Sequence, residues 1–217
     1  MGLLLKKRAE SIQELDTLMM NLYGEITENT LLMKMYEIAP IIRRPVEVDL
    51  NASYPELGIR CFGKGTFHKP ALSGIEVGTK KLFQIKEGDI IFSNVFAWEG
   101  GIGIAQKEDN NRYGSHRFIC CVPVHDIIKT SFLWFHFFTP TGSEQIQQAS
   151  PGGAGRNRTL GLKKLEQIEV PIPKKEHQEK FDKVFQKIQR IKKEMNKLNE
   201  PYEQLIPAII EYNLKPQ

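Results

Sequence analysis

SPGGAGRNRTLGLKKLEQIEVPIPKKEHQEKF, residues 150–181, joins four unlike segments: a glycine pair, a basic run, a short apolar segment interrupted by prolines, and the start of a long charged helix. Glycines and arginines together predict a flexible basic loop. The charged residues that follow the last proline predict a helix start. We therefore expect a globular domain to end at about residue 173 and a helical segment to occupy residues 174–217.

The predicted C-terminal helix carries apolar residues in alternating steps of three and four, which is the heptad spacing of a coiled coil. These seam residues are Phe181, Val184, Ile188, Ile191, Met195, Leu198, Tyr202 and Leu205. A helix from about residue 176 to about residue 213 would be roughly 57 Å long at about 1.5 Å per residue, so we expect it to project. Pro201 and Pro207 each lack a backbone N–H, which predicts a kink or a restart there.

A second, shorter helix is predicted at the N-terminus, in residues 1–25. Its larger side chains show the same spacing, at Leu5, Arg8, Ile12, Leu15, Met19 and Leu22. Gly24 follows the last of them, where a helix commonly stops.

The middle of the chain, residues 26–173, changes to short apolar runs separated by glycine, asparagine and proline. Strands are expected near residues 37–43, 57–62, 82–85, 89–94, 101–107 and 117–124. The polar residues 107–114 predict a hairpin loop between the last two strands. A helical stretch is expected in residues 125–150, with Asp126 or Thr130 as a cap and Pro140 as a stop. The expected fold is α+β: a globular mixed α/β domain with a long projecting C-terminal coiled-coil helix and a shorter N-terminal helix.

Composition narrows the class of protein. The chain has 217 residues, of which 41% are hydrophobic, enough for a real core. It has no apolar run of membrane-spanning length and no secretory signal, and its three cysteines do not form the even set of a disulfide framework. We therefore expect a cytoplasmic protein with reduced thiols and no membrane partner. The net charge of +4 permits an acidic partner without requiring one.

No known catalytic or metal-binding motif is present. Cys120, Cys121 and His116 lack the spacing of a zinc site. Asp89 follows a glycine at a strand start, but no Glu-x-Lys completes a nuclease triad, and FGKGTF (62–67) favours a tight turn over a cofactor loop. The sequence predicts no catalysis and no bound metal, although folding alone can still bring carboxylates together.

Two kinds of side chain are candidates for nucleic-acid contact. The aromatic residues of 132–138 cover most of a helix surface, which favours the core over a base-stacking platform. Trp98, beside a glycine pair, is equally compatible with the core and with the surface. GGAGRNR (152–158) offers flexible arginines that can bind phosphate or a guanine edge, or it is an ordinary solvated loop.

Several segments, taken in order, resemble one half of a type I restriction–modification DNA specificity subunit. They are LGIRCFGKGTF, FQIKEGDIIFSNVFAWEGGIGIA, GSHRF, the stretch from GGAGRNR to QEKF and the heptad helix, with QIEVPIP followed by Gln178 as the most specific part. The resemblance covers essentially the whole chain. It implies a target recognition domain that reads part of a split DNA site, and a helical spacer that docks methyltransferase subunits. LMMNLYGEI (18–26) resembles the closing segment of one conserved region, and LIPAIIEYNL (205–214) resembles the same segment after the next, so the chain is either a natural half-subunit or a piece of a longer protein.

The resemblance carries over no individual base contact, because recognition loops vary with the site they read. We expect DNA contacts from polar residues in predicted loops: Lys64, His68, Lys69, Arg112, His116, Arg117, Arg156 and Arg158. Asn110 and Asn111 are expected to suit adenine edges.

On this interpretation the chain is a non-catalytic reader of double-stranded DNA, with methyltransferase and restriction subunits as partners. A natural half-subunit would form a homodimer on an inverted-repeat site. S-adenosylmethionine and ATP would bind only to partner subunits. The alternative is a coiled-coil adaptor that binds protein, with arginines that only keep it soluble.

Overall fold

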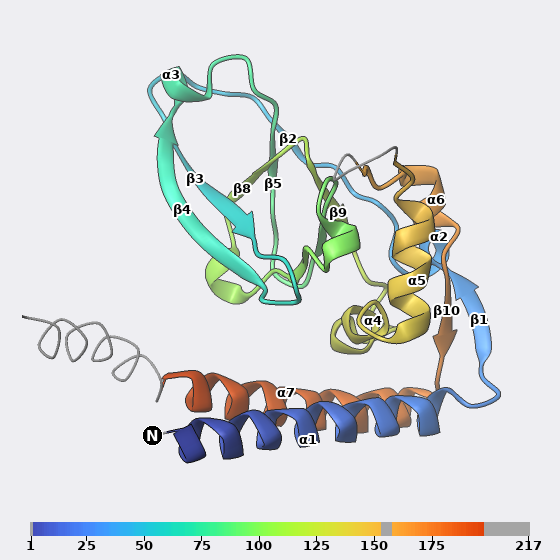
Figure 1. Ribbon diagram of the computed structural model, residues 1–217. Helices are drawn as coiled ribbons and strands as arrows, with labels where there is room; N and C mark the ends of the chain where they lie inside the picture. Colours follow the sequence, from blue (N-terminus) through green and yellow to red (C-terminus); the bar gives the residue numbers. More distant parts are fainter. Residues whose placement is uncertain (1, 153–157, 198–217) are drawn as a thin grey trace, which may run out of the picture. The chain divides into compact units, whose positions relative to one another are not determined.

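The computed structural model describes residues 2–152 and 158–197 (Figure 1). The chain divides into two compact units. One is helical and combines residues 1–28 with residues 179–217, and the other comprises residues 29–178. The α+β class expected from the sequence is confirmed.

The helical unit contains α1 (Gly2–Thr27) and most of α7 (Lys175–Lys197), which run antiparallel side by side (Figure 1). The rings of Tyr23 and Phe181 meet edge to face, 6.5 Å between centroids. Farther along the pair, Lys192 forms an ion pair with Asp16.

The predicted stop of α1 at Gly24 is wrong, because the helix continues to Thr27. Tyr23 and Ile26 are both buried and extend the apolar stripe past the glycine. One glycine inside a helix costs about 1 kcal/mol, which burying two large side chains more than offsets.

A five-stranded sheet forms one part of the mixed α/β unit, in the order β2-β5-β8-β3-β4. Its strands are β2 (Pro45–Val46), β3 (Ser53–Ile59), β4 (Thr66–Ser73), β5 (Leu82–Gln84) and β8 (Tyr113–Ser115). β3 and β4 form an antiparallel hairpin with a register shift between Pro55 and Leu57, and β3 pairs with β8 in parallel. Short helix α3 (Gly74–Val77) follows β4 and is capped by Ser73.

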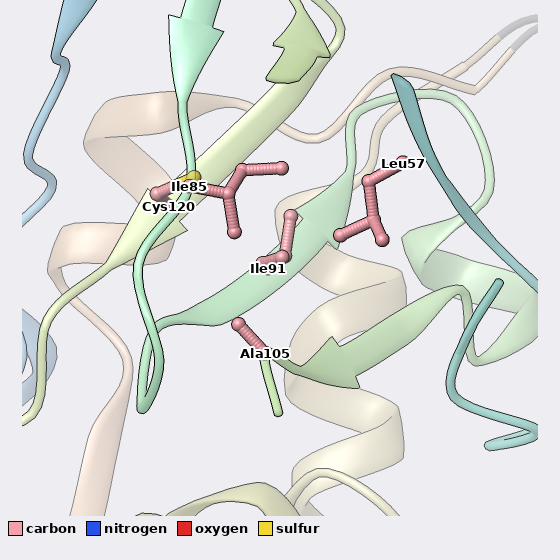
Figure 2. Close-up of a cluster of buried hydrophobic side chains, with 5 residues drawn as sticks. All are labelled: Leu57, Ile85, Ile91, Ala105 and Cys120. Carbon is pink, nitrogen blue, oxygen red and sulfur yellow. The ribbon is translucent and has the colours of Figure 1, made fainter. Parts of the chain in front are cut away.

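A three-stranded antiparallel sheet lies next to it in the core, in the order β7-β6-β9. Its strands are β6 (Ile90–Ser93), β7 (Ile102–Ile104) and β9 (Phe118–Cys121), with 3₁₀ turns η1 (Ala97–Glu99) and η2 (Lys107–Asp109) at the two ends of β7. Figure 2 shows the apolar cluster that joins the two sheets: Leu57, Ile85, Ile91, Ala105 and Cys120. Burial in this cluster raises the pKa of the Cys120 thiol to about 12.

The remaining elements complete the mixed α/β unit. Strand β1 (Leu31–Lys34) pairs with β10 (Glu169–Ile172) in a separate two-stranded sheet. The helices are α2 (Met35–Ile38), α4 (Thr130–His136), α5 (Pro140–Ala149) and α6 (Leu162–Glu166). The core role expected for the aromatic residues of 132–138 is confirmed by buried Phe132, Phe135 and Phe137.

Several predicted elements differ from the structure. Residues 37–43 do not form a strand: they end α2 and then make only an isolated bridge between Ile41 and Cys121. Residues 107–114 do not close a hairpin, because β7 and β9 each pair with β6 instead of with each other. The stretch 125–150 forms two helices, and Pro140 opens the second one behind the capping side chain of Thr139.

Strand β4 was not predicted. It is an edge strand and contains Pro70, whose missing N–H is tolerated at a sheet edge. Residues 68–71 are all exposed, so the strand buries too little for apolar alternation to appear in the sequence.

Candidate nucleic-acid interface

Residues 94–101 follow β6 and are called the 94–101 segment below. Both ends of this segment form backbone hydrogen bonds with surface loops. The N–H of Asn94 donates to the C=O of Arg117 at 2.7 Å, and the C=O of Asn94 accepts from the N–H of Leu160 at 2.8 Å. At its other end, the C=O groups of Glu99 and Gly100 accept from residues 62 and 63, at 2.8 and 3.0 Å. The segment thus ties together the loops that carry the predicted contacts Lys64, His116, Arg117 and Arg158.

Trp98 lies in this segment with its ring partly exposed and its indole Nε1 donating to the C=O of Val95 at 3.1 Å. The guanidinium of Arg158 lies over that ring, 5.0 Å from its centroid. An isolated bridge between Gly152 and Arg158 closes the base of the basic loop. Trp98 is half-buried, so it belongs wholly to neither of the two roles left open for it, and its ring contacts the guanidinium of Arg158. Arg156, predicted in the same loop, lies outside the described residues.

The turn between β3 and β4, residues 60–65, carries exposed Lys64 and continues into His68 on β4. The ring Nε2 of His68 lies 2.8 Å from Oδ1 of Asp109. Lys69, the next residue of β4, is exposed.

Asp109 organises this edge of the domain, and sequence reasoning missed it. Its carboxylate is buried, with 1% of the residue exposed, yet it accepts from the hydroxyl of Thr66 and the N–H of Gln106, both at 2.9 Å, as well as contacting His68. The spacing of Gln106 and Asp109 is that of a capping box, which was the one available signal.

The three residues after Asp109 are engaged within the protein. Asn110 accepts from the N–H of Glu87 at 2.8 Å, and Asn111, at φ +62°, accepts from the amide of Gln84 at 3.3 Å. Arg112 donates to the C=O of Glu56 at 3.3 Å. Their polar groups therefore stabilise the η2 corner.

Arg44 and Asp89 form a bidentate ion pair, with N–O distances of 2.6 and 3.0 Å. Asp89 also accepts from the N–H of Lys86, and its hydrogen bonds raise the pKa of Arg44 above its ordinary value. This buried carboxylate is thus committed to holding the turn before β6.

The seam residues of α7 lie along the face that α1 covers. Phe181 and Ile188 are buried, while Val184, Ile191 and Met195 are half-buried. Phe185 is also buried and stacks on Phe181, although it lies outside the predicted seam. Leu198, Tyr202 and Leu205 lie outside the described residues, as do Pro201 and Pro207.

The described parts of the chain offer no group of three or more His, Cys, Asp or Glu side chains placed to hold a metal ion. None of the helices described in residues 2–152 and 158–197 is long and apolar enough to cross a membrane.

Comparison with known proteins identifies the class. Residues 31–201 match the model of the type I restriction modification DNA specificity domain. Because this match spans most of the chain, the protein belongs to that family. Comparison with curated protein sequences gives no match.

Solved structures share the fold. The HsdS subunit from Thermoanaerobacter tengcongensis is 13% identical, with a TM-score of 0.62 over 85% of this chain and 48% of that one. A chain from a study of complex assembly and conformational transition of the type I R-M system is 16% identical, with a TM-score of 0.55 over 96% of this chain and 53% of that one. The chain therefore spans about half the length of these structures.

Proposed function

We propose that this protein reads one half of a split sequence in double-stranded DNA and docks methyltransferase subunits. The observation that carries the proposal is the 94–101 segment, because its backbone hydrogen bonds gather the loops of Lys64, Arg117 and Arg158. Membership of the specificity-domain family supports the same conclusion.

The gathered side chains suit a DNA duplex. Arg117 and Lys64 are exposed, so they can reach phosphates without losing internal contacts. Arg158 is held over Trp98, and a guanidinium oriented in advance loses less entropy when it forms a bidentate contact with phosphate or guanine.

The second half of the site would be read by a second recognition domain, supplied by another copy of the chain or by the rest of a longer one. The solved structures with this fold are about twice as long, which supports either arrangement. The chain itself would be non-catalytic and cytoplasmic. S-adenosylmethionine would bind to the methyltransferase partner, and ATP to a restriction partner.

Selection from randomised duplex DNA tests this function, with the protein alone and with a candidate methyltransferase subunit. We expect enrichment of a short motif and an affinity that falls steeply with salt, because phosphate contacts release counterions. Failure to enrich any motif at low salt in both conditions would favour the coiled-coil adaptor.

Variants of the interface give a second readout. The slope of log K against log salt is negative, and Arg117→Ala should make it less steep by about 0.9, which corresponds to the loss of one phosphate contact. Lys187→Ala, at an exposed position of α7, is the matched control and should leave the slope unchanged.

A further inference from the structure

The 60–65 turn holds an aromatic side chain out in solvent. Phe62 is 73% exposed and has φ +60°, in the left-handed region that side chains other than glycine and asparagine rarely adopt. Gly63 and Gly65 also have positive φ. A turn needed only to join β3 to β4 would be easier to form with glycine or asparagine at position 62. The exposed ring therefore has no explanation in folding.

Backbone hydrogen bonds fix this turn. The N–H of Phe62 donates to the C=O of Glu99 at 2.8 Å, and the N–H of Arg60 donates to the C=O of Gly65 at 2.9 Å. Gly63 lies so close to Phe138 that a Cβ there would come within 2.9 Å of the ring. Phe138 in turn packs on Trp134, with ring centroids 4.3 Å apart. Hydrogen bonds and the half-buried rings of Phe138 and Trp134 thus fix the backbone of the turn, while the ring of Phe62 lies in solvent.

Two cationic side chains belong to this turn, Arg60 and Lys64. Lys64 is exposed two residues farther on, and the guanidinium of Arg60 lies over Phe67, 4.6 Å from the ring centroid. Phe96, in the 94–101 segment, is a second exposed ring, at 44%. An apolar tip with cations behind it complements a duplex, whose phosphates lie outside and whose apolar base stack lies inside.

We propose that Phe62 is a wedge that enters between two neighbouring base pairs of the bound duplex and unstacks them. This inference rests on the proposed DNA-reading function and specifies how part of the site is read. Pyrimidine–purine steps unstack most easily, so the wedge selects a TA or CA/TG step at its point of entry without any hydrogen bond to a base.

The test uses the duplex enriched by the selection described above, with 2-aminopurine placed at one step after another. Binding of the unchanged protein should raise the fluorescence at a single step, where stacking is lost. Phe62→Gly should abolish that rise and weaken Kd by about 10- to 100-fold, the usual loss when an aromatic ring stacked on a base is removed. The same variant should melt at a higher temperature, since glycine accepts positive φ, so its loss of binding is not a loss of folding.

Two further variants complete the design. Phe62→Trp should keep the fluorescence rise. Ile75→Ala removes an equally exposed apolar side chain, 75% accessible, from α3 and should change neither binding nor fluorescence.

The outcomes separate this inference from the function beneath it. Tight binding by the unchanged protein with no fluorescence rise at any step overturns the wedge and leaves the DNA reader standing. Absence of binding to any duplex overturns both. If Phe62→Gly distorts DNA normally but no longer retains the methyltransferase subunit, the ring is a protein contact and the wedge is wrong.

Discussion

Replacing Asp109 with alanine should destabilise the mixed α/β unit more than any other single change at the candidate interface. The buried carboxylate accepts hydrogen bonds from the hydroxyl of half-buried Thr66 and the N–H of Gln106, and it contacts the half-exposed ring of His68. A hydrogen bond to a charged group contributes about 1.5 kcal/mol or more, so the bonds from Thr66 and Gln106 and a smaller contribution from His68 sum to about 4 kcal/mol.

The variant Asp109→Asn separates the contribution of the side chain's shape to stability from the contribution of its charge. Asp109→Asn keeps an oxygen that can face Thr66 and Gln106, so it should lose roughly half as much, about 2 kcal/mol. Glu108→Ala, at the exposed neighbouring residue, should change the free energy of unfolding by less than about 0.5 kcal/mol.

Urea unfolding followed by tryptophan fluorescence measures all three variants. With a slope of about 2 kcal/mol per molar urea, the alanine variant should shift the midpoint by about 2 M. A shift below about 0.5 M for Asp109→Ala would refute the view that this carboxylate organises the interface edge.

Three more changes test the fold. Arg44→Lys replaces a bidentate contact to Asp89 with a single one and should lower the free energy of unfolding by about 1–2 kcal/mol in thermal melts. Burial lowers the pKa of His136 from 6.5 to about 4, so the unfolded chain takes up a proton first as pH falls. The free energy of unfolding should therefore drop by roughly 3 kcal/mol between pH 6.5 and 4. Urea titrations at several pH values measure this drop, which His136→Gln should lack. Ile188→Glu places a charge between α1 and α7 and should reduce helicity by circular dichroism, whereas the exposed Lys187→Glu should not.

The helical seams could be predicted from the sequence because their spacing is local. Each step of three or four residues records the same requirement, that one stripe of the helix is covered. Local spacing does not predict which helix packs against the stripe. In the structure, α1 of the same chain packs against α7. Helicity is therefore a direct readout of Ile188→Glu, because the partner helix belongs to the same chain.

The sheets were harder to predict because their pairing is not local. Strand β8 pairs with β3 and β5, and neither pairing is visible in the three residues of the strand. The segment 37–43 is apolar enough for a strand, but its backbone is used by α2 and one bridge.

The interface shows the same division between local and distant information. Charge and turn composition placed Lys64 and Arg158 outside the regular strands, which the structure confirms, whereas His68 and Lys69 were also expected in loops and lie in strand β4. The loops of Lys64 and Arg158 are brought together by backbone hydrogen bonds to the 94–101 segment. Nearly every residue type has the same backbone N–H and C=O groups, so the sequence does not predict these bonds. The internal bonds of Asn110 depend likewise on Glu87, which lies 23 positions away.

Substitutions in strand β4 should affect the stability of the fold less than substitutions in the residues that support the strand. Its outer edge is unpaired within the described sheet, and residues 68–71 bury little, so most substitutions there should alter stability by no more than about 0.5 kcal/mol. The strand is supported by Asp109, which binds Thr66, and the neighbouring apolar cluster of Leu57 and Ile91 stabilises the two sheets. A library randomised at Lys64 and at residues 69–71, which leaves the contact of His68 with Asp109 intact, would therefore vary the surface without changing the residues that support it. On the proposed function, substitutions at the exposed positions of β4 would change the target preference while the protein continues to fold.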